Sequence, residues 1–201
     1  MNRREILKYA AVTAAGSLAV NGANAQEPGG ELYSFWTHGN VVQPENPNAL
    51  QSIVRIGWGT QIRGKSGAAS WFHIAIPTST ELGNRHIQLA AVYLLFKVDG
   101  ASVRNLHVYD GPRKIKAFDG LPIKPREDLT TGIVPGNTWA INPPLAISFG
   151  VSLAINVQFS AIIDGSATGP LDILFSGAGA DFRTETPKIN INQHFLPQKK
   201  R

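Results

Sequence analysis

Apolar and polar residues alternate along most of the chain beyond residue 30. The alternation is most regular over residues 151–160, whose apolar members are Val151, Leu153, Ile155, Val157 and Phe159. A second regular stretch, residues 70–77, has Phe72, Ile74 and Ile76 on one side and Trp71, His73 and Ala75 on the other. Successive side chains of a strand point to opposite faces, so both stretches predict β-strands with one buried face.

Residues 87–98 form the longest apolar run, and both of its alternating faces are apolar. This pattern predicts a central strand covered on both sides, with Ile87, Leu89, Ala91, Tyr93 and Leu95 sharing one face. A helix is the competing interpretation, because Leu and Ala favour helices. The strand is preferred because Asp99 and Gly100 end the run as a hairpin turn would.

Further short strands are expected, separated by turn formers. Their ranges are 31–36, 51–58, 103–109, 113–118 and 171–175. Loops are expected at 43–48, where Pro44 and Pro47 exclude a helix, and also at 59–69 and 121–137. A glycine-dependent bend is expected at 177–182. No amphipathic helix is expected after residue 30, so the sequence predicts an all-β protein, a single antiparallel β-sandwich or jelly-roll-like domain over residues 26–185.

The N-terminus resembles a twin-arginine export signal. Arg3 and Arg4 are followed by Ile6, Leu7 and Lys8, and then by a weakly apolar run that ends in Ala23-Asn24-Ala25. Small residues at this spacing are typical of a signal-peptide cleavage site. We therefore expect residues 1–25 to be removed, the mature protein to be periplasmic or secreted, and no transmembrane segment to remain. An amphipathic helix of the mature domain is the alternative interpretation of this segment.

Composition narrows the chemistry further. The 201 residues include no cysteine, which excludes disulfides, thiolate nucleophiles and thiolate metal sites. The net charge is +5, of which residues 1–25 carry +2 and the last fourteen residues +4, leaving −1 for residues 26–187. Nucleic-acid binding needs a basic stripe on a folded face, so the near-neutral charge of residues 26–187 argues against a nucleic-acid partner. Residues 186–201 are expected to form a basic, flexible tail.

Two glycine-rich segments match nucleotide-binding motifs in form only. Residues 59–66 read G-x-x-x-x-G-K-S, but Gly67 and Pro77 prevent the long helix that a phosphate loop requires. Gly177-Ala178-Gly179 resembles the start of a dinucleotide fingerprint but has no helix behind it. We interpret both as features of strands and turns, and we expect no cofactor.

Aromatic and histidine side chains supply the candidate ligand-binding site. The candidate wall is Trp36, His38, Trp71, His73, His107, Tyr109 and Asp110. Aromatic rings stack on sugars and other flat ligands, and histidine titrates near neutral pH. No close pair of histidines is present, so a resident metal is not expected, although His38, His73 and His107 could meet if their strands converge. The carboxylates Asp110, Asp119, Glu127 and Asp128 lie in turn-like contexts with no sign that two of them converge.

Several segments together resemble a bacterial domain family of unknown function. They are Trp36–Gly39, Trp71–Pro77, Leu106–Gly111, Val151–Phe159 and Gly179–Phe182. The resemblance spans residues 32–182 and implies a single domain. It draws attention to His38, His73, His107 and Asp110 without assigning them roles.

Three functions remain open from the sequence. The preferred hypothesis is an exported β-sandwich that binds a small molecule or glycan. The second is a histidine-based, metal-dependent enzyme. The third is a self-associating structural or envelope-associated protein that pairs through exposed strand edges. The sequence does not decide the oligomeric state.

Overall fold

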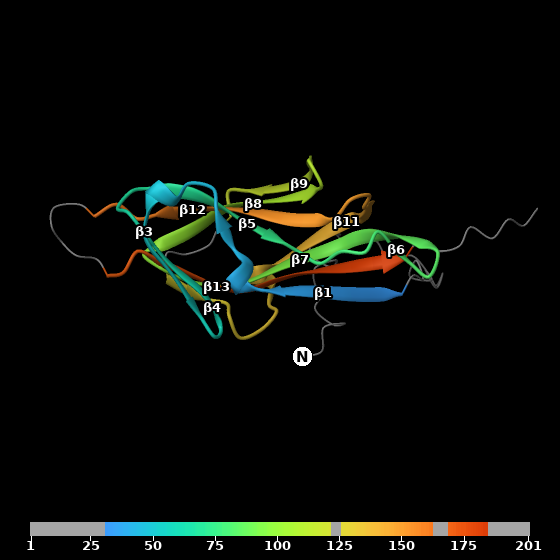
Figure 1. Ribbon diagram of the computed structural model, residues 1–201, viewed down its shortest axis with the longest axis horizontal. Helices are drawn as coiled ribbons and strands as arrows, with labels where there is room; N and C mark the ends of the chain where they lie inside the picture. The colour runs from blue at the N-terminus through green and yellow to red at the C-terminus, as the bar shows by residue number, and fades with distance from the viewer. Residues whose placement is uncertain (1–30, 122–125, 163–168, 185–201) are drawn as a thin grey trace, which may run out of the picture.

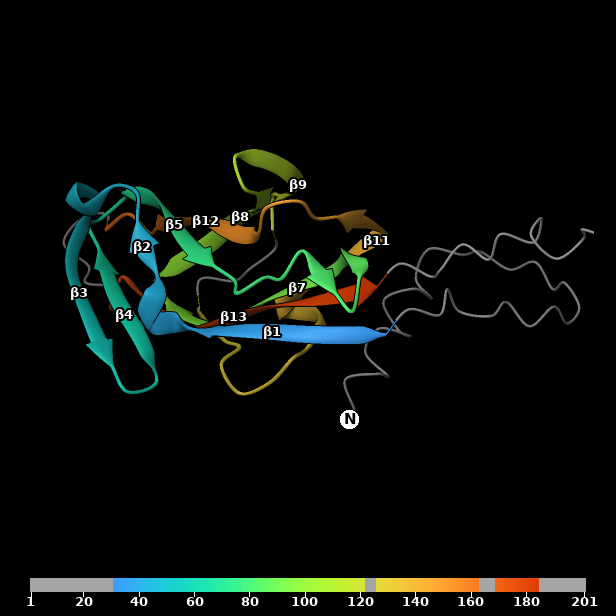
Figure 2. The same cartoon turned by 45° about the vertical axis from the view of Figure 1, so that its right-hand side comes forward.

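The computed structural model describes residues 31–121, 126–162 and 169–184. Within these ranges the protein is built from strands in two antiparallel sheets, one above the other, as Figures 1 and 2 show from two directions. The predicted all-β sandwich is therefore confirmed. None of the helices in these three ranges has the length and apolar character needed to cross a membrane.

The first sheet has eight strands in the order β10-β7-β13-β4-β3, with β1 beside β13 and both β11 and β6 beside β7. Its strands are β1 (Leu32–His38), β3 (Leu50–Ile56), β4 (Gly59–Gly64), β6 (Glu81–Leu82), β7 (Arg85–Asp99), β10 (Arg126–Asp128), β11 (Thr138–Ala146) and β13 (Asp172–Thr184). The long strand β13 is paired twice along one edge. Its first residues pair with β4 and its later residues with β1.

The second sheet has five strands in the order β2-β5-β12-β8-β9. They are β2 (Gln43–Pro44), β5 (Ala69–Ala75), β8 (Ala101–Asp110), β9 (Arg113–Asp119) and β12 (Val151–Phe159). Short 3-10 helices, η1 (Gly39–Val41), η2 (Pro47–Ala49) and η3 (Pro135–Asn137), lie in the connections. In Figure 1, β5, β8, β9 and β12 form the upper layer, and β1, β13 and β4 lie below.

The core lies between the sheets and is filled by every second residue of the facing strands. Phe72 of β5 and Phe175 of β13 meet across it, with ring centroids 5.4 Å apart. Phe72, Ile74 and the five apolar residues predicted on β12 are all buried, which confirms the inward faces of these two strands. Their alternate residues must then point away from the core.

The central strand predicted at 87–98 is β7, but its strict alternation was wrong. Ala91 pairs with Asp181 and Leu89 with Phe182, which leaves Ala90 as an extra residue. A β-bulge of this kind turns the following side chains over. Ile87 and Leu89 therefore face the core together with the even-numbered residues Val92, Leu94, Phe96 and Val98.

The loop predicted at 59–69 is largely a strand. Residues 59–64 form β4, which pairs with both β3 and β13. Glycines suggested a loop, but Gly64 is small for a packing reason, since a Cβ on it would lie 2.1 Å from the Phe159 ring. Because the G-x-x-x-x-G-K-S segment is strand and turn followed by β5, it lacks the helix of a phosphate loop.

The hairpin predicted at Asp99-Gly100 was also wrong. The turn exists, and Gly100 has a φ of 68°, but β7 and β8 belong to different sheets. The Gly100 carbonyl accepts a hydrogen bond from the N–H of Ser160, the residue that follows β12 of the second sheet. This turn therefore carries the chain from one layer to the other.

Three smaller expectations need correction. The bend predicted at 177–182 is part of strand β13, and one of its glycines, Gly179, makes room for a tryptophan, as described below. Strand β11 was not predicted, because Pro143 and Pro144 interrupt its pattern. Pro47 begins the helix η2, since proline is accepted at the first position of a helix.

The predicted signal peptide, 1–25, and tail, 186–201, lie outside the described residues, whereas most of the predicted domain, 26–185, lies within them.

Gly39 is the residue at which the chain leaves the first sheet for the second. Substitution of Gly39 measures how tightly this crossing is packed. A Cβ on Gly39 would lie 1.9 Å from the Phe175 carbonyl oxygen. Gly39→Ala is therefore expected to lower the free energy of unfolding by about 3 kcal/mol, because the backbone must shift. Gly57→Ala is the matched control, since nothing lies within 4 Å of its Cβ position. Urea denaturation of both variants measures the effect, and equal stabilities would contradict it.

Candidate functional site

The outer face of the five-stranded sheet brings the predicted site residues of β5 and β8 together. Ala154 of β12 pairs with His73 on one side and with His107 on the other. Two residues further along, Asn156 pairs with Trp71 and Asn105. Because directly opposed residues in a sheet share a face, these side chains lie on one surface. We call this surface the outer face.

Trp71 and His107 are the centre of the outer face. Their ring centroids are 4.8 Å apart and the rings are inclined by 42°. They come from β5 and β8, which flank β12, so the two rings meet above β12. Ala154 is only 4% exposed although it points outward. The methyl group at this position leaves room for both rings to lie over the strand.

A carboxylate holds the His107 ring in place. His107 Nε2 lies 2.8 Å from Asp119 Oδ1, and the Asn105 amide donates to the same oxygen. Donation from Asn105 and from His107 lowers the pKa of the Asp119 carboxyl, so it is ionised at neutral pH. An ionised carboxylate only accepts hydrogen bonds, so Nε2 carries the proton in this contact. The imidazole side chain is 13% exposed, packed between Trp71 and Asp119.

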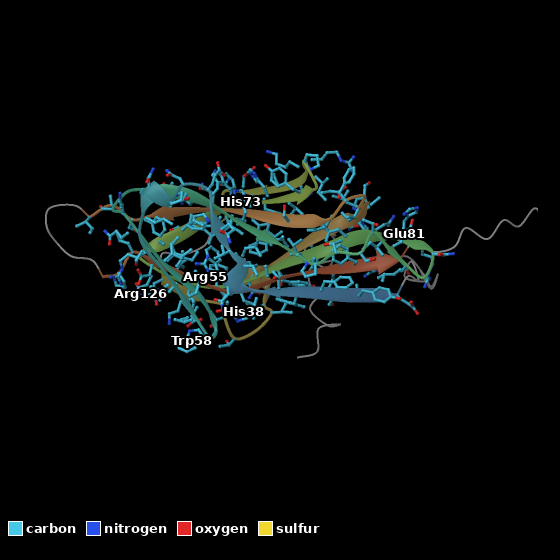
Figure 3. All side chains as sticks on the ribbon, viewed as in Figure 1. His38, Arg55, Trp58, His73, Glu81 and Arg126 are labelled. Carbon is cyan, nitrogen blue, oxygen red and sulfur yellow. The ribbon has the colours of Figure 1, made fainter. Side chains whose placement is uncertain are left out.

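Polar groups lie on both sides of this aromatic centre. His73 Nε2 contacts Glu45 Oε2 at 3.0 Å, and the two side chains are 46% and 60% exposed. Tyr109, two residues beyond His107, is half-buried and pairs with Ser152 and Lys114. Figure 3 shows His73 on the upper side of the molecule, on the outer face.

Asp110, by contrast, belongs to the fold and not to the outer face. Its side chain is fully buried and accepts hydrogen bonds from the backbone N–H groups of Ser148, Phe149 and Gly150. Arg113 Nη2 donates to it at 2.7 Å. Burial alone would raise the pKa of the Asp110 carboxyl, but the N–H donors and the guanidinium hold that pKa below its ordinary value of 3.8. The carboxylate fastens the loop before β12 to the end of β8.

Trp36 and His38 lie on β1 of the other sheet, so the predicted wall of seven residues is divided. Trp36 stacks on Tyr93 at 5.5 Å and lies over Gly179, where a Cβ would be 2.5 Å from its ring. His38 Nδ1 accepts a hydrogen bond from the Asn40 N–H and caps η1. Figure 3 places His38 on the lower side, away from His73.

The three histidines therefore do not form a common site. Across the described parts of the chain, no group of three His, Cys, Asp or Glu side chains is arranged to hold a metal ion. The hypothesis of a metal bound by His38, His73 and His107 is not supported by this placement.

Sequence reasoning missed several polar residues of the outer face. Asn156 was visible on the polar side of the 151–160 alternation but was not chosen. Asn105, Asp119 and Glu45 were not identified, because their roles depend on partners 12 to 28 residues away. Asp119 had been interpreted as a turn residue, although its carboxylate orients His107.

Fold and site together define an antiparallel β-sandwich domain with an aromatic and polar patch on the outside of its smaller sheet. The chain belongs to the family of unknown function DUF6623, whose model matches residues 32–182. The resemblance to such a family expected from the sequence is thus confirmed.

Among curated proteins there is no match to this sequence. Among solved structures, the chain is similar to CBM29_1, a Family 29 Carbohydrate Binding Module from Piromyces equi. The two are 10% identical, the similarity covers 74% of this chain and 90% of that one, and the TM-score is 0.34.

The buried carboxylate of Asp110 yields a stability prediction. Asp110→Asn is expected to lower the free energy of unfolding at neutral pH by about 2–4 kcal/mol, because the backbone donors and Arg113 lose a charged acceptor. Because the pKa of Asp110 is lower in the folded protein than its unfolded value of 3.8, the ionised carboxylate stabilises the fold above pH 3.8. This stabilisation is lost as the pH falls through the folded-state pKa. The difference in free energy of unfolding between wild type and variant should therefore narrow in acid.

Urea denaturation at neutral pH and at about pH 3 measures this difference. Asp119→Asn is the matched control. The Asp119 carboxylate is 59% exposed, so a much smaller decrease in the free energy of unfolding is expected. A stability gap for Asp110→Asn that is absent at neutral pH, or that widens in acid, would contradict the assigned role.

Proposed function

We propose that the outer face binds carbohydrate, and that Trp71 is the principal contact. The observation that carries this proposal is the Trp71–His107 pair, with ring centroids 4.8 Å apart above β12. A half-buried tryptophan packed against an oriented imidazole is a rigid, flat contact surface. Rigid aromatic surfaces bind with little loss of side-chain entropy.

The mixture of groups around Trp71 fits a sugar. A pyranose ring offers C–H groups on its faces, which pack on an aromatic ring, and hydroxyl groups at its edge, which need hydrogen-bond partners. Asn105 and Asn156 are half-buried amides, and Glu45 and Asp119 are exposed carboxylates. Amide and carboxylate oxygens accept from hydroxyl groups, and amide N–H groups donate to them.

The charges of the outer face favour a neutral ligand. Both histidines lie beside carboxylates, His73 beside Glu45 and His107 beside Asp119. Lys114, on β9, adds a positive charge in register with Tyr109. The opposite signs are interspersed, so no large field of one sign would select a strongly charged ligand.

The burial of His107 and its contact with Asp119 favour binding over catalysis. Its Nε2 is directed to Asp119, and only 13% of its side chain is exposed. A general acid or base must reach the proton that it transfers, so a ring packed between Trp71 and a carboxylate is suited to support the tryptophan. Self-association through strand edges stays a prediction.

Substitution of Trp71 tests the proposed function. Trp71→Ala is expected to weaken binding of the affected polysaccharide at least about tenfold, because the stacking surface is lost. Affinity electrophoresis against soluble hydroxyethylcellulose, xylan, glucomannan and glycol chitin, followed by calorimetry with the retarding polymer, measures the change.

Trp58→Ala is the matched control. Trp58 is a tryptophan at the β3–β4 turn of the other sheet and is 66% exposed, so its removal should leave binding unchanged. Figure 3 shows Trp58 on the side of the molecule opposite His73. If none of the four polymers retards the wild type, or if both variants bind equally well, the proposal is wrong.

The proposed place of action is outside the cytoplasm. Support comes from the sequence of residues 1–25, in which paired arginines precede a weakly apolar run and a small-residue cleavage site. Polysaccharide ligands of the envelope or the surroundings would be accessible there. This export proposal is independent of the binding proposal.

Exchange of the paired arginines tests export. The double variant Arg3→Lys with Arg4→Lys is expected to remain as uncleaved precursor in the cytoplasm, because the twin-arginine route reads both guanidinium groups. Cell fractionation with immunoblotting locates the product, and N-terminal sequencing of the wild type should begin at Gln26. An uncleaved wild type in the cytoplasm, or normal export of the double variant, would contradict the proposal.

A further inference from the structure

Phe149 is an exposed aromatic residue close to the end of the outer face. Its side chain is 68% exposed, although large apolar side chains are usually buried. It lies against Gly111 in the turn between β8 and β9, where a Cβ on the glycine would be 2.9 Å from Phe149 Cβ. Gly111 directly follows Asp110, the last residue of β8, the strand that carries His107 and Tyr109.

The loop that carries Phe149 is held firmly. The Phe149 N–H donates to Asp110 Oδ1 at 2.8 Å, and the neighbouring N–H groups of Ser148 and Gly150 donate to the same carboxylate. The Gly111 N–H donates to the Gly150 carbonyl at 2.9 Å. A fully buried carboxylate thus fixes the backbone that carries an exposed ring. An exposed ring on a fixed backbone loses little conformational entropy when a ligand binds to it.

Two aromatic contacts lie at different points of β8 and the turn that follows it. His107 and Tyr109 are alternate residues of β8, about 7 Å apart, and Gly111 is the first residue of the turn after Asp110. Trp71 packs on His107, and Phe149 packs on Gly111. Ser152 and Lys114 flank Tyr109 in register and offer polar groups between the two ends.

We propose that Trp71, Tyr109 and Phe149 form one track along β8 that binds a linear polysaccharide lengthwise, over several sugar units. This inference rests on the proposed function and specifies its ligand class as a chain instead of a single sugar. Successive rings stack on successive sugar units, and the polar groups between the rings bind hydroxyl groups. Phe149 then contacts only ligands long enough to reach it from Trp71.

Calorimetry with a length series tests the track. The probes are cello-, xylo-, manno- and chito-oligosaccharides from disaccharide to hexasaccharide. The wild type should bind the hexasaccharide of the preferred series more tightly than the disaccharide. Phe149→Ala should weaken hexasaccharide binding about tenfold and change disaccharide binding less than about twofold, while Phe149→Tyr keeps the ring and the affinity.

Two variants separate this inference from the proposed function. Trp71→Ala should weaken binding at every length, and Trp58→Ala, another exposed aromatic, should change none. If Trp71→Ala loses binding but Phe149→Ala binds every length like the wild type, the track is wrong and the Trp71 site stands. If no oligosaccharide of any series binds the wild type, both are wrong. Because Phe149 is exposed, thermal unfolding of its variants should match the wild type, which excludes misfolding as the cause.

Discussion

The contact between Phe72 and Phe175 connects the two sheets, and the position of the site depends on it. Both side chains are fully buried, and their centroids are 5.4 Å apart. Once Phe72 faces the core, the alternation of β5 directs Trp71 and His73 outward. The same reasoning applies to β12, where burial of Leu153 and Ile155 directs Ala154 outward. The hydrophobic effect therefore determines which side chains can meet a ligand, although none of these outward residues contributes to the core.

Charged groups differ in role according to the side of the sheet on which they lie. Asp110 is buried, and it is retained because three backbone N–H groups and Arg113 compensate for the loss of water. Asp119 is exposed and orients a single imidazole. One carboxylate thus stabilises a loop of the fold and the other arranges the outer face. In the sequence both look alike, since each precedes a glycine in a turn.

Only part of the candidate site could be predicted from the sequence. Four of the predicted residues lie on β5 and β8, whose sequences alternate between apolar and polar positions. Their common face follows from the pairing of both strands with β12, and they are Trp71, His73, His107 and Tyr109. Trp36 and His38 were grouped with them on residue type alone, but β1 pairs with β13 in the other sheet. Which strands become neighbours depends on packing between distant parts of the chain, and local periodicity carries no information about it.

By itself the sequence determined the all-β class, the inward faces of β5 and β12, and the double burial of β7, because period-two hydrophobicity reports directly on burial. Only the tertiary structure decided that Asp99-Gly100 joins two sheets, that residues 59–64 are a strand and that Ala90 is a bulge. The physical reason is common to all three. Glycines and turn formers show that the backbone can bend or be approached closely, and the neighbouring strand, not the local sequence, determines which of these occurs.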